Sequence, residues 1–197
     1  MSRWQYVSEV FASLRRLQIK GTKIYWCCGN RDFLLNKKVW SLFGAVGIAD
    51  PHVITVAGST FFISHGDQFC LNDKAYMRFR RWTQKRWLRQ LFLALPFFYR
   101  LKIAKRLRRA SESRMATQVA AATTMDVDEQ AIVAAARKLA ATHIIHGHTH
   151  NSKVHHHQGI ERWVLSDWDM DHAQRGNYLA MANTGELALH QVTMANR

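Results

Sequence analysis

The segment IIHGHTH, residues 144–150, places three histidines within five positions directly behind an apolar run. In a tight loop after a strand, the alternate rings of His148 and His150 face the same side, and the glycine lets the backbone approach closely. Imidazole nitrogen, together with a side-chain amide oxygen, suits Mn, Fe or Zn. One HxH pair taken alone is equally compatible with solvated rings or with rings packed in the core. The segment therefore predicts a metal site, provided that other ligands gather beside it.

Two further polar clusters follow segments that have the composition of strands. Residues 23–28, KIYWCC, are rich in β-formers and run directly into Asn30, Arg31 and Asp32. Residues 53–67, VITVAGSTFFISHGD, predict two strands around an Ala-Gly-Ser turn, and the second strand ends at His65. Open α/β sheets bind ligands beyond the carboxyl ends of their strands, so three such clusters favour a metal site over unrelated histidines.

The rest of the chain predicts helices and strands in alternation, followed mainly by strands. Helices are expected over 4–17 and 34–44, and the tract 73–123, which lacks β-signal, predicts an inserted helical lid interrupted only by Pro96. Asp126, with Glu129 three residues later, predicts the N-cap of an Ala-rich helix. Short antiparallel strands are expected over 154–157, 162–166, 177–182 and 186–192. This order predicts a single α/β sandwich domain over residues 1–197.

The composition fits a globular protein with an anionic partner. The chain has 197 residues, 48% of them hydrophobic, and its 28 Lys and Arg against 14 Asp and Glu give a formal charge of +14. Three cysteines form neither a disulfide framework nor a paired CxxC, so reduced thiols in the cytoplasm are expected. The longest apolar stretch, residues 91–99, is too short to span a bilayer, which predicts a soluble or membrane-surface protein.

The motifs GNRDFLL, SHGDQFC with its following ND, and HGHTH occur in this order and together resemble the calcineurin-like metallophosphoesterases. Arg31, where the broad superfamily has histidine, makes the chain similar to a narrower family, the UDP-2,3-diacylglucosamine hydrolases of the lipid A pathway in Gram-negative bacteria. LFLALP and MDV agree with that family, and the similarity runs from about residue 20 to the C-terminus. The resemblance implies an αββα metallophosphoesterase sandwich with an inserted helical lid.

The resemblance also implies residue roles and a cofactor. Asn30, His65 and His148 would ligate one metal of a two-metal Mn²⁺ site, and His150 would ligate the other. The catalytic set would be Asn30, Arg31 and His148. The substrate would meet Asn30, Arg31, Asp73, Ser113 and His148, with the Arg31 guanidinium on a phosphate. The implied reaction is hydrolysis of the pyrophosphate bond of UDP-2,3-diacylglucosamine to UMP and 2,3-diacylglucosamine 1-phosphate.

The family supplies its remaining metal ligands from an N-terminal D-x-H strand and a second strand that ends in GD, and this sequence has neither ahead of Asn30. We therefore expect an N-terminally incomplete copy whose activity alone is low, since a bridging carboxylate neutralises charge and fixes the nucleophile. The acidic segment SDWDMDH, residues 166–172, is a weaker candidate for replacing these ligands. Asp32 and Asp67 are expected to orient neighbouring loops. His155, His156 and His157 lie in one predicted strand, where alternate rings must face opposite ways.

A basic tract, residues 78–109, holds twelve Lys and Arg and no acidic residue. Part of it must form amphipathic helices that cover the core, but a purely structural face usually mixes charge signs. Aromatic residues among basic ones suit adsorption to an anionic bilayer, here the cytoplasmic face of the inner membrane, and also suit nucleic acid. The continuous apolar block favours lipid, and no nucleic-acid partner is expected. The alternative function is a noncatalytic basic protein of this fold that binds lipid or nucleic acid.

Overall fold

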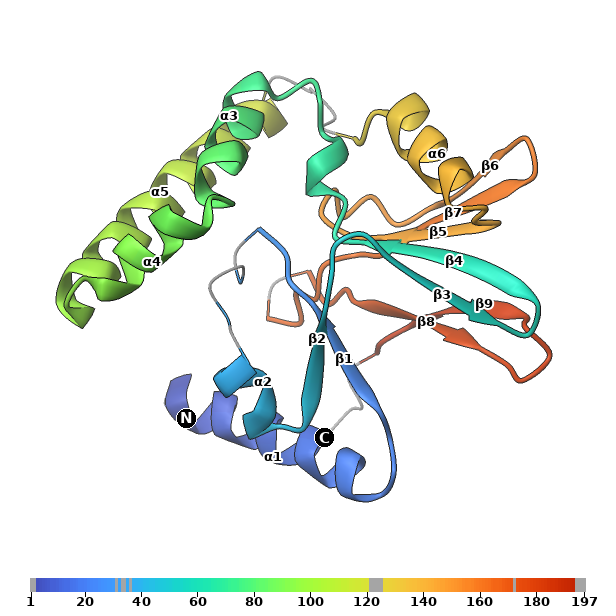
Figure 1. The fold of residues 1–197 in the computed structure, drawn as a ribbon, viewed down its shortest axis with the longest axis horizontal. Coiled ribbons are helices and arrows are strands. Elements are labelled where there is room, and N and C mark those ends of the chain that lie inside the picture. The colour runs from blue at the N-terminus through green and yellow to red at the C-terminus, as the bar shows by residue number, and fades with distance from the viewer. Residues whose placement is uncertain are drawn as a thin grey trace. The chain divides into compact units, whose positions relative to one another are not determined.

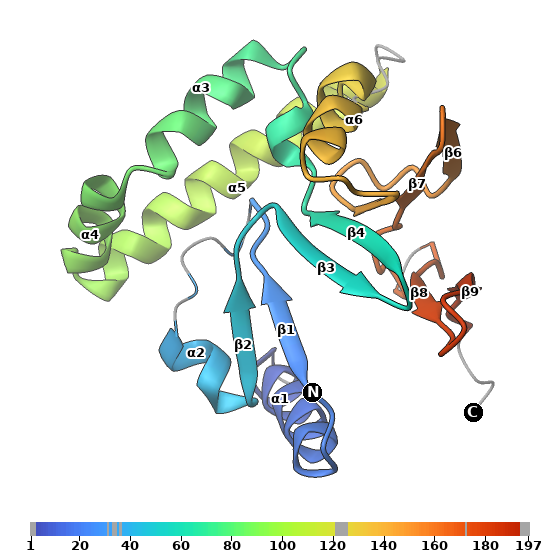
Figure 2. The ribbon, with the colours of Figure 1, turned by 45° about the vertical axis from the view of Figure 1, so that its right-hand side comes forward.

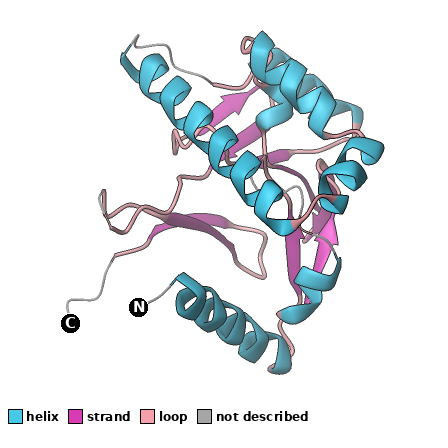
Figure 3. Cartoon of the chain, turned by 90° about the vertical axis from the view of Figure 1, so that its left-hand side faces the viewer, coloured by secondary structure: helices cyan, strands magenta, loops and turns pink. Residues whose placement is uncertain are grey.

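The protein is represented by a computed structural model that describes residues 3–30, 32, 35, 37–120, 126–171 and 173–193. The chain divides into two compact units. Met1–His65 and Val133–Arg197 form the first, which we call the core unit, and Gly66–Ile132 form the second, the helical unit. The tract 73–123, expected from the sequence to be an insertion, falls inside the helical unit. Figure 3 shows the strands and helices of both units.

The core unit contains a five-stranded mixed sheet in the order β3-β4-β5-β7-β6 (Figure 1). Its strands are β3 (His52–Val56), β4 (Ser59–Ser64), β5 (His143–His146), β6 (Val154–His157) and β7 (Ile160–Val164). The pairs β3–β4 and β6–β7 are antiparallel, whereas β4–β5 and β5–β7 are parallel. This mixture of strand directions, together with the helices below, confirms the α/β class.

The central strand β4 is buried on both faces, because the adjacent apolar side chains of Phe61 and Phe62 point to opposite sides of the sheet. Phe61, Phe62 and Ile144 are almost fully buried, and burial of such side chains contributes roughly 1.5–3 kcal/mol each. The register pairs Ser64 with His146, the last residues of β4 and β5. Because these two strands are parallel neighbours that end level, the chain leaves both at the same edge of the sheet.

Two smaller sheets complete the core unit. β1 (Ile24–Cys27) pairs in parallel with β2 (Ala45–Ile48), and β8 (Asn177–Met181) pairs antiparallel with β9 (Leu187–Gln191). The strands β6 to β9 confirm the short strands expected from the sequence. β2 was not predicted, because Gly44 and Gly47 indicate a break. The structure explains Gly47, since a Cβ there would overlap the ring of Trp40.

Helices α1 (Arg3–Ile19) and α2 (Lys37–Leu42) belong to the same unit as β1 and β2 (Figure 2). The ring of Phe11 on α1 lies 4.7 Å from that of Phe43, which in turn lies 5.6 Å from the ring of Trp26 on β1. Phe43 is fully buried. Both helices were predicted, and this aromatic cluster explains why the apolar face of α1 packs where it does.

The helical unit consists of α3 (Lys74–Thr83), α4 (Arg86–Ala94) and α5 (Phe97–Ala120), preceded by a short 3-10 turn at Asp67–Phe69. In Figures 1 and 2, α5 runs back alongside α3 and α4. The prediction that Pro96 alone interrupts this tract was wrong. The chain also breaks at Gln84 and Lys85, where Lys85 is extended before α4 begins. Among the described helices, none has the length and apolar character needed to cross a bilayer.

Helix α6 (Glu129–Lys138) leads from the helical unit back into the core unit. Its N-cap is Asp128, whose carboxylate accepts a hydrogen bond of 2.8 Å from the backbone N–H of Ala131. The predicted cap, Asp126, was wrong, since its carboxylate accepts from the adjacent Val127 N–H instead. An N-cap side chain accepts a hydrogen bond from the backbone N–H of the third residue after it. The helix therefore starts two residues later than the sequence suggested.

Candidate metal centre

The rings of His65 and His148 lie together at the shared edge of β4 and β5. His65 follows β4, and His148 follows β5 by two residues. Nδ1 of His148 lies 3.2 Å from Nε2 of His65, and the two rings are 5.0 Å apart between centroids and steeply inclined. The N–H of Gly147 also donates to the carbonyl of His65. The level ends of two parallel strands therefore bring two imidazoles from distant segments into one site.

The loop after β1 packs against this pair through a glycine. A Cβ at Gly29 would lie 2.7 Å from Cε1 of His65, so the backbone touches the ring face directly. Asp32 fixes this loop, since its carboxylate accepts from the Gly29 N–H and, at 2.8 Å, from the indole N–H of Trp26. These contacts are those expected of Asp32 from the sequence. Asn30 follows Gly29 directly and is half-buried.

Asp50 holds the backbone that carries His65, and sequence reasoning missed it. Its carboxylate accepts 2.6 Å from the Ser64 hydroxyl and 3.3 Å from the His65 N–H. The residue follows β2, the strand that was not predicted, so the only available signal was a polar residue after an apolar run. Burial, with Asp50 nearby, also raises the pKa of the Cys27 thiol to about 12. Cys27 is thus a protonated thiol beside the site.

The second histidine of HxH has a different neighbour. Nδ1 of His150 lies 3.5 Å from the Asp167 carboxylate, which Arg175 holds by two hydrogen bonds of 2.6 and 2.9 Å. Asp167 belongs to the acidic segment that the sequence offered as a weaker source of ligands. His148 and His150 both adopt left-handed backbone angles, with φ of 68° and 56°. Two tight turns in succession therefore point the two rings toward different partners.

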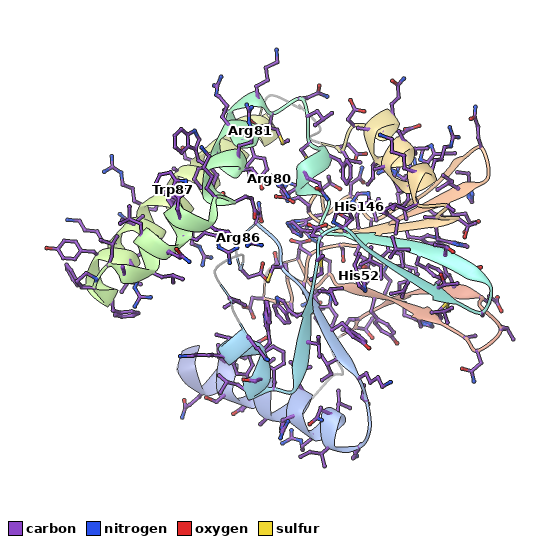
Figure 4. The ribbon with its side chains drawn as sticks, in the orientation of Figure 1. His52, Arg80, Arg81, Arg86, Trp87 and His146 are labelled. Atoms are coloured by element: carbon purple, nitrogen blue, oxygen red, sulfur yellow. The ribbon has the colours of Figure 1, made fainter. Side chains whose placement is uncertain are left out.

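Behind the site, an arginine is buried in the sheet. The side chain of Arg162 on β7 is 1% exposed and lies 3.1 Å from Nε2 of His146, the last residue of β5. Its Nε donates at 3.4 Å to Nε2 of His157 on β6. Figure 4 shows where His146 lies. Rings of His155 and His157 stack on one face while His156 is exposed, as alternation in a strand predicted.

The donor set fits a divalent metal in part. With metal–nitrogen bonds of about 2.0–2.1 Å, two ligands on one ion lie roughly 2.9–3.4 Å apart for octahedral to tetrahedral angles. The 3.2 Å between the His65 and His148 nitrogens falls in that range. The Thr149 hydroxyl between the two candidate histidines is buried and lacks a hydrogen-bond partner among the described residues, which fits a polar ligand beside it. Within the described ranges, no three His, Cys, Asp or Glu side chains gather closely enough to hold an ion.

The remaining predicted site residues are placed as follows. Arg31 lies outside the described residues. Asp73 caps α3, since its carboxylate accepts 2.8 Å from the Tyr76 N–H. Ser113 is exposed on α5. Asp67 is 3% exposed and its carboxylate binds the Tyr76 hydroxyl and, at 2.9 Å, the Arg80 guanidinium. Asp67 therefore anchors α3, an orienting contact of the kind expected from the sequence.

A mixed α/β core with two facing histidines beyond its strand ends is an arrangement that metal-dependent hydrolases use, and comparison with known proteins identifies the family. UDP-2,3-diacylglucosamine hydrolase of Ralstonia nicotianae is 44% identical over 193 residues, covering 94% of this chain and 72% of the relative. The enzymes of the same name from Haemophilus ducreyi and Aeromonas salmonicida are 39% and 38% identical and are covered over 70% and 72% of their lengths. The chain belongs to the UDP-2,3-diacylglucosamine hydrolase family.

Two other comparisons add little. No protein-family model matches the chain. A solved structure described as a novel archaeal phosphodiesterase aligns over 93% of this chain and 75% of its own, with a TM-score of 0.48 and 10% identity. At that distance the likeness carries no argument, so the family assignment depends on the sequence relatives. Enzymes of this metallophosphoesterase type use a divalent metal cofactor.

Proposed function

We propose that this chain carries out the hydrolysis of UDP-2,3-diacylglucosamine, cleaving its pyrophosphate bond to release UMP and 2,3-diacylglucosamine 1-phosphate in the lipid A pathway. The observation that supports this most strongly is the His65–His148 pair, with its nitrogens 3.2 Å apart at the ends of two parallel strands. Membership of the family supports UDP-2,3-diacylglucosamine as the substrate. The two facing histidines are the residues of this chain that could bind the metal needed for hydrolysis.

In this proposal the protein mainly positions its groups. His65 and His148 would hold one ion through the facing nitrogens, with Asn30 beside them, and His150 would hold a second. Bound divalent metal, for which Mn²⁺ is our candidate, lowers the pKa of a water and neutralises phosphoryl charge. Arg31 would bind a phosphate through its planar guanidinium. Asp73 and Ser113 are proposed substrate contacts. The Asp73 carboxylate can accept further hydrogen bonds besides the one from the Tyr76 N–H that caps α3.

The hydrolase proposal is tested by UMP release with Mn²⁺. The chain is measured as it stands and after extension by a family segment that carries the D-x-H and GD motifs, because we expect these 197 residues alone to bind metal weakly. The extended protein should release UMP, and His148→Ala should reduce its rate by at least 100-fold, while Asp171→Asn, an exposed change, should not. A folded, metal-loaded extended protein that releases no UMP would contradict the proposal.

We also propose that residues 78–109 adsorb to an anionic membrane surface, placing the enzyme at the cytoplasmic face of the inner membrane. Nine of the twelve basic side chains in the tract are exposed: Arg78, Arg81, Lys85, Arg86, Lys102, Lys105, Arg106, Arg108 and Arg109. Large apolar side chains are exposed among them, including Trp82 at 55%, Trp87 at 56% and Phe98 at 71%. Figure 4 labels Arg81, Arg86 and Trp87 on α3 and α4.

One face of α3 shows how both kinds of side chain meet. Leu71 and Met77 line a shallow groove of about 460 Å³ whose other lining residues are Lys74, Arg78 and Arg81. The Lys85 ammonium lies 4.1 Å above the Trp82 ring. Cations around an apolar floor suit a lipid headgroup above acyl chains. The alternative, a noncatalytic basic protein of this fold, would use the same surface for nucleic acid.

Vesicle binding separates these possibilities. Each basic side chain near an anionic bilayer contributes about 1 kcal/mol, roughly fivefold in partitioning. Arg81→Ala with Arg86→Ala should therefore weaken binding to phosphatidylglycerol vesicles by about 25-fold. Lys37→Ala with Lys38→Ala, which removes the same charge from α2, should leave it near the original value. Equal losses in both variants, or tighter binding to RNA than to vesicles at the same salt, would refute the membrane proposal.

A further inference from the structure

The carboxylate of Asp167 lies between an arginine and a candidate metal ligand. Arg175 donates from Nε to Oδ1 at 2.6 Å and from its terminal nitrogen to Oδ2 at 2.9 Å. The same Oδ2 lies 3.5 Å from Nδ1 of His150. The Asp167 side chain is 24% exposed and the His150 side chain is 36% exposed. Asp167 is thus the least exposed of the three groups and contacts both of the others.

The loop that carries Asp167 is fastened at both ends. Asp169 and Arg175 exchange backbone hydrogen bonds of 2.9 and 3.1 Å, which close the turn between them. At the other end, the buried Asn177 side chain accepts from the Ser166 N–H at 3.0 Å and donates to the Ser152 hydroxyl at 2.6 Å. Ser152 lies two residues after His150. Asn177 therefore ties the segment that precedes Asp167 to the segment that follows His150.

We propose that Asp167, held by Arg175, is a positioning residue that fixes the ring orientation and tautomer of His150. A metal-binding imidazole usually donates its other N–H to a carboxylate, and this partner orients the ring. Nδ1 is the ring nitrogen of His150 that lies 3.5 Å from the carboxylate, so in this proposal its proton points to Asp167 and Nε2 is the nitrogen that remains for an ion. The inference depends on the proposed function for the identity of that ion as a divalent metal.

The geometry favours orientation over direct ligation by Asp167. Both of its oxygens already accept hydrogen bonds from the Arg175 guanidinium, and such a bidentate pair neutralises the charge that a metal would need. The acidic segment 166–172 thus supplies an orienting group for a ligand.

The test begins on metal-free protein, so that it does not depend on catalysis. Long-range ¹⁵N–¹H NMR, at a pH where an ordinary histidine is neutral, reports the tautomer of each ring, and His150→Gln assigns the signal. The Nδ1–H form of His150 should dominate in the wild type. Asp167→Ala should shift the ring toward the Nε2–H form, Asp167→Asn should largely keep the Nδ1–H form because its amide oxygen still accepts, and Asp171→Asn is the matched control.

Mn²⁺ affinity, measured by equilibrium dialysis, is the second readout. Asp167→Ala should weaken binding by about 10–100-fold, the usual effect of losing an outer hydrogen-bond partner, and Asp167→Asn should recover most of that loss. An unchanged tautomer in Asp167→Ala would overturn the inference. So would an Asp167→Asn variant that loses as much affinity as His150→Gln, since that pattern marks a direct ligand. A tautomer shift, combined with an extended, metal-loaded protein that releases no UMP, would refute the proposed function and leave Asp167 as the orienting group.

Discussion

A methyl group at position 29 is a small change that should disturb the candidate metal centre directly. The backbone of Gly29 does not adopt a left-handed angle, so alanine is allowed there, but its Cβ would lie 2.7 Å from Cε1 and 2.8 Å from Nδ1 of His65. Ordinary carbon contacts begin at about 3.5 Å. The imidazole must therefore move by about 0.8 Å to accept the methyl group.

That displacement is large compared with the tolerance of the site. The nitrogens of His65 and His148 are 3.2 Å apart, and a shared ion requires roughly 2.9–3.4 Å. A shift of that size along the line joining the two nitrogens takes the spacing to about 2.4 or 4.0 Å, outside this range, and a sideways shift turns the nitrogen lone pair away from the shared position. We expect Mn²⁺ affinity to fall by about 10–100-fold. Overpacking should also cost about 1–3 kcal/mol of stability, which lowers Tm by roughly 2–12 °C.

Isothermal titration with Mn²⁺ and a thermal melt measure both effects in the Gly29→Ala variant. Gly147→Ala is the matched comparison, because it adds the same methyl group beside the same histidines and its nearest neighbour would be the His65 carbonyl oxygen at 4.0 Å. This variant should bind Mn²⁺ much better than Gly29→Ala. If Gly29→Ala bound Mn²⁺ and melted like the wild type, the packing of Gly29 on His65 would not be what positions this ring.

Three further outcomes follow from the contacts described. Arg162→Ala should lower the free energy of unfolding by about 3–5 kcal/mol in urea, because it leaves a cavity and removes a hydrogen bond from each of two imidazoles; a loss below about 1 kcal/mol would contradict this reading, and Arg162→Met should cost less. Burial beside Asp67 raises the pKa of the Cys70 thiol from 9.0 to about 12, so its contribution to stability is full below pH 9 and is lost as the pH rises toward 12. The stability advantage of the wild type over Cys70→Ala should shrink over that range, and a constant difference would refute the assignment. Asp67→Asn should loosen α3 and increase amide exchange in Lys74–Thr83, since it weakens the bonds to Tyr76 and Arg80; unchanged exchange would show that α3 is held elsewhere.

The sequence predicted the parts of the site that depend on local order along the chain. Polar clusters directly after apolar strands indicated His65 and His148, and the parallel register of β4 and β5 is what brings them together. The same reasoning missed Asp50, because its partners Ser64 and His65 lie 14 and 15 residues away and meet it only in the folded chain. It also missed the pairing of Asp167 with His150, which depends on a turn that no local pattern defines.

Elements with mixed signals were the least predictable. β2 contains a glycine that packing against Trp40 requires, so its propensity indicated a loop where tertiary contact favours a strand. Arginine is a residue type usually found at the surface. Arg162 is nevertheless buried, because two imidazoles accept hydrogen bonds from its guanidinium. The helix break at Gln84 and Lys85 contains no proline or glycine that would have indicated it. Asp126 and Asp128 are both suitable N-cap residues and lie only two positions apart, so the sequence alone did not decide between them. In each case long-range packing or a choice between neighbours decided the outcome.

Anomalous diffraction from crystals grown with Mn²⁺ tests the central claim most directly, since it locates the ion without relying on turnover. The account predicts an anomalous peak within about 2.1 Å of both Nε2 of His65 and Nδ1 of His148, and the loss of that peak in His148→Ala. A peak bound elsewhere, or two rings that stay hydrogen-bonded to each other in saturating Mn²⁺, would contradict it.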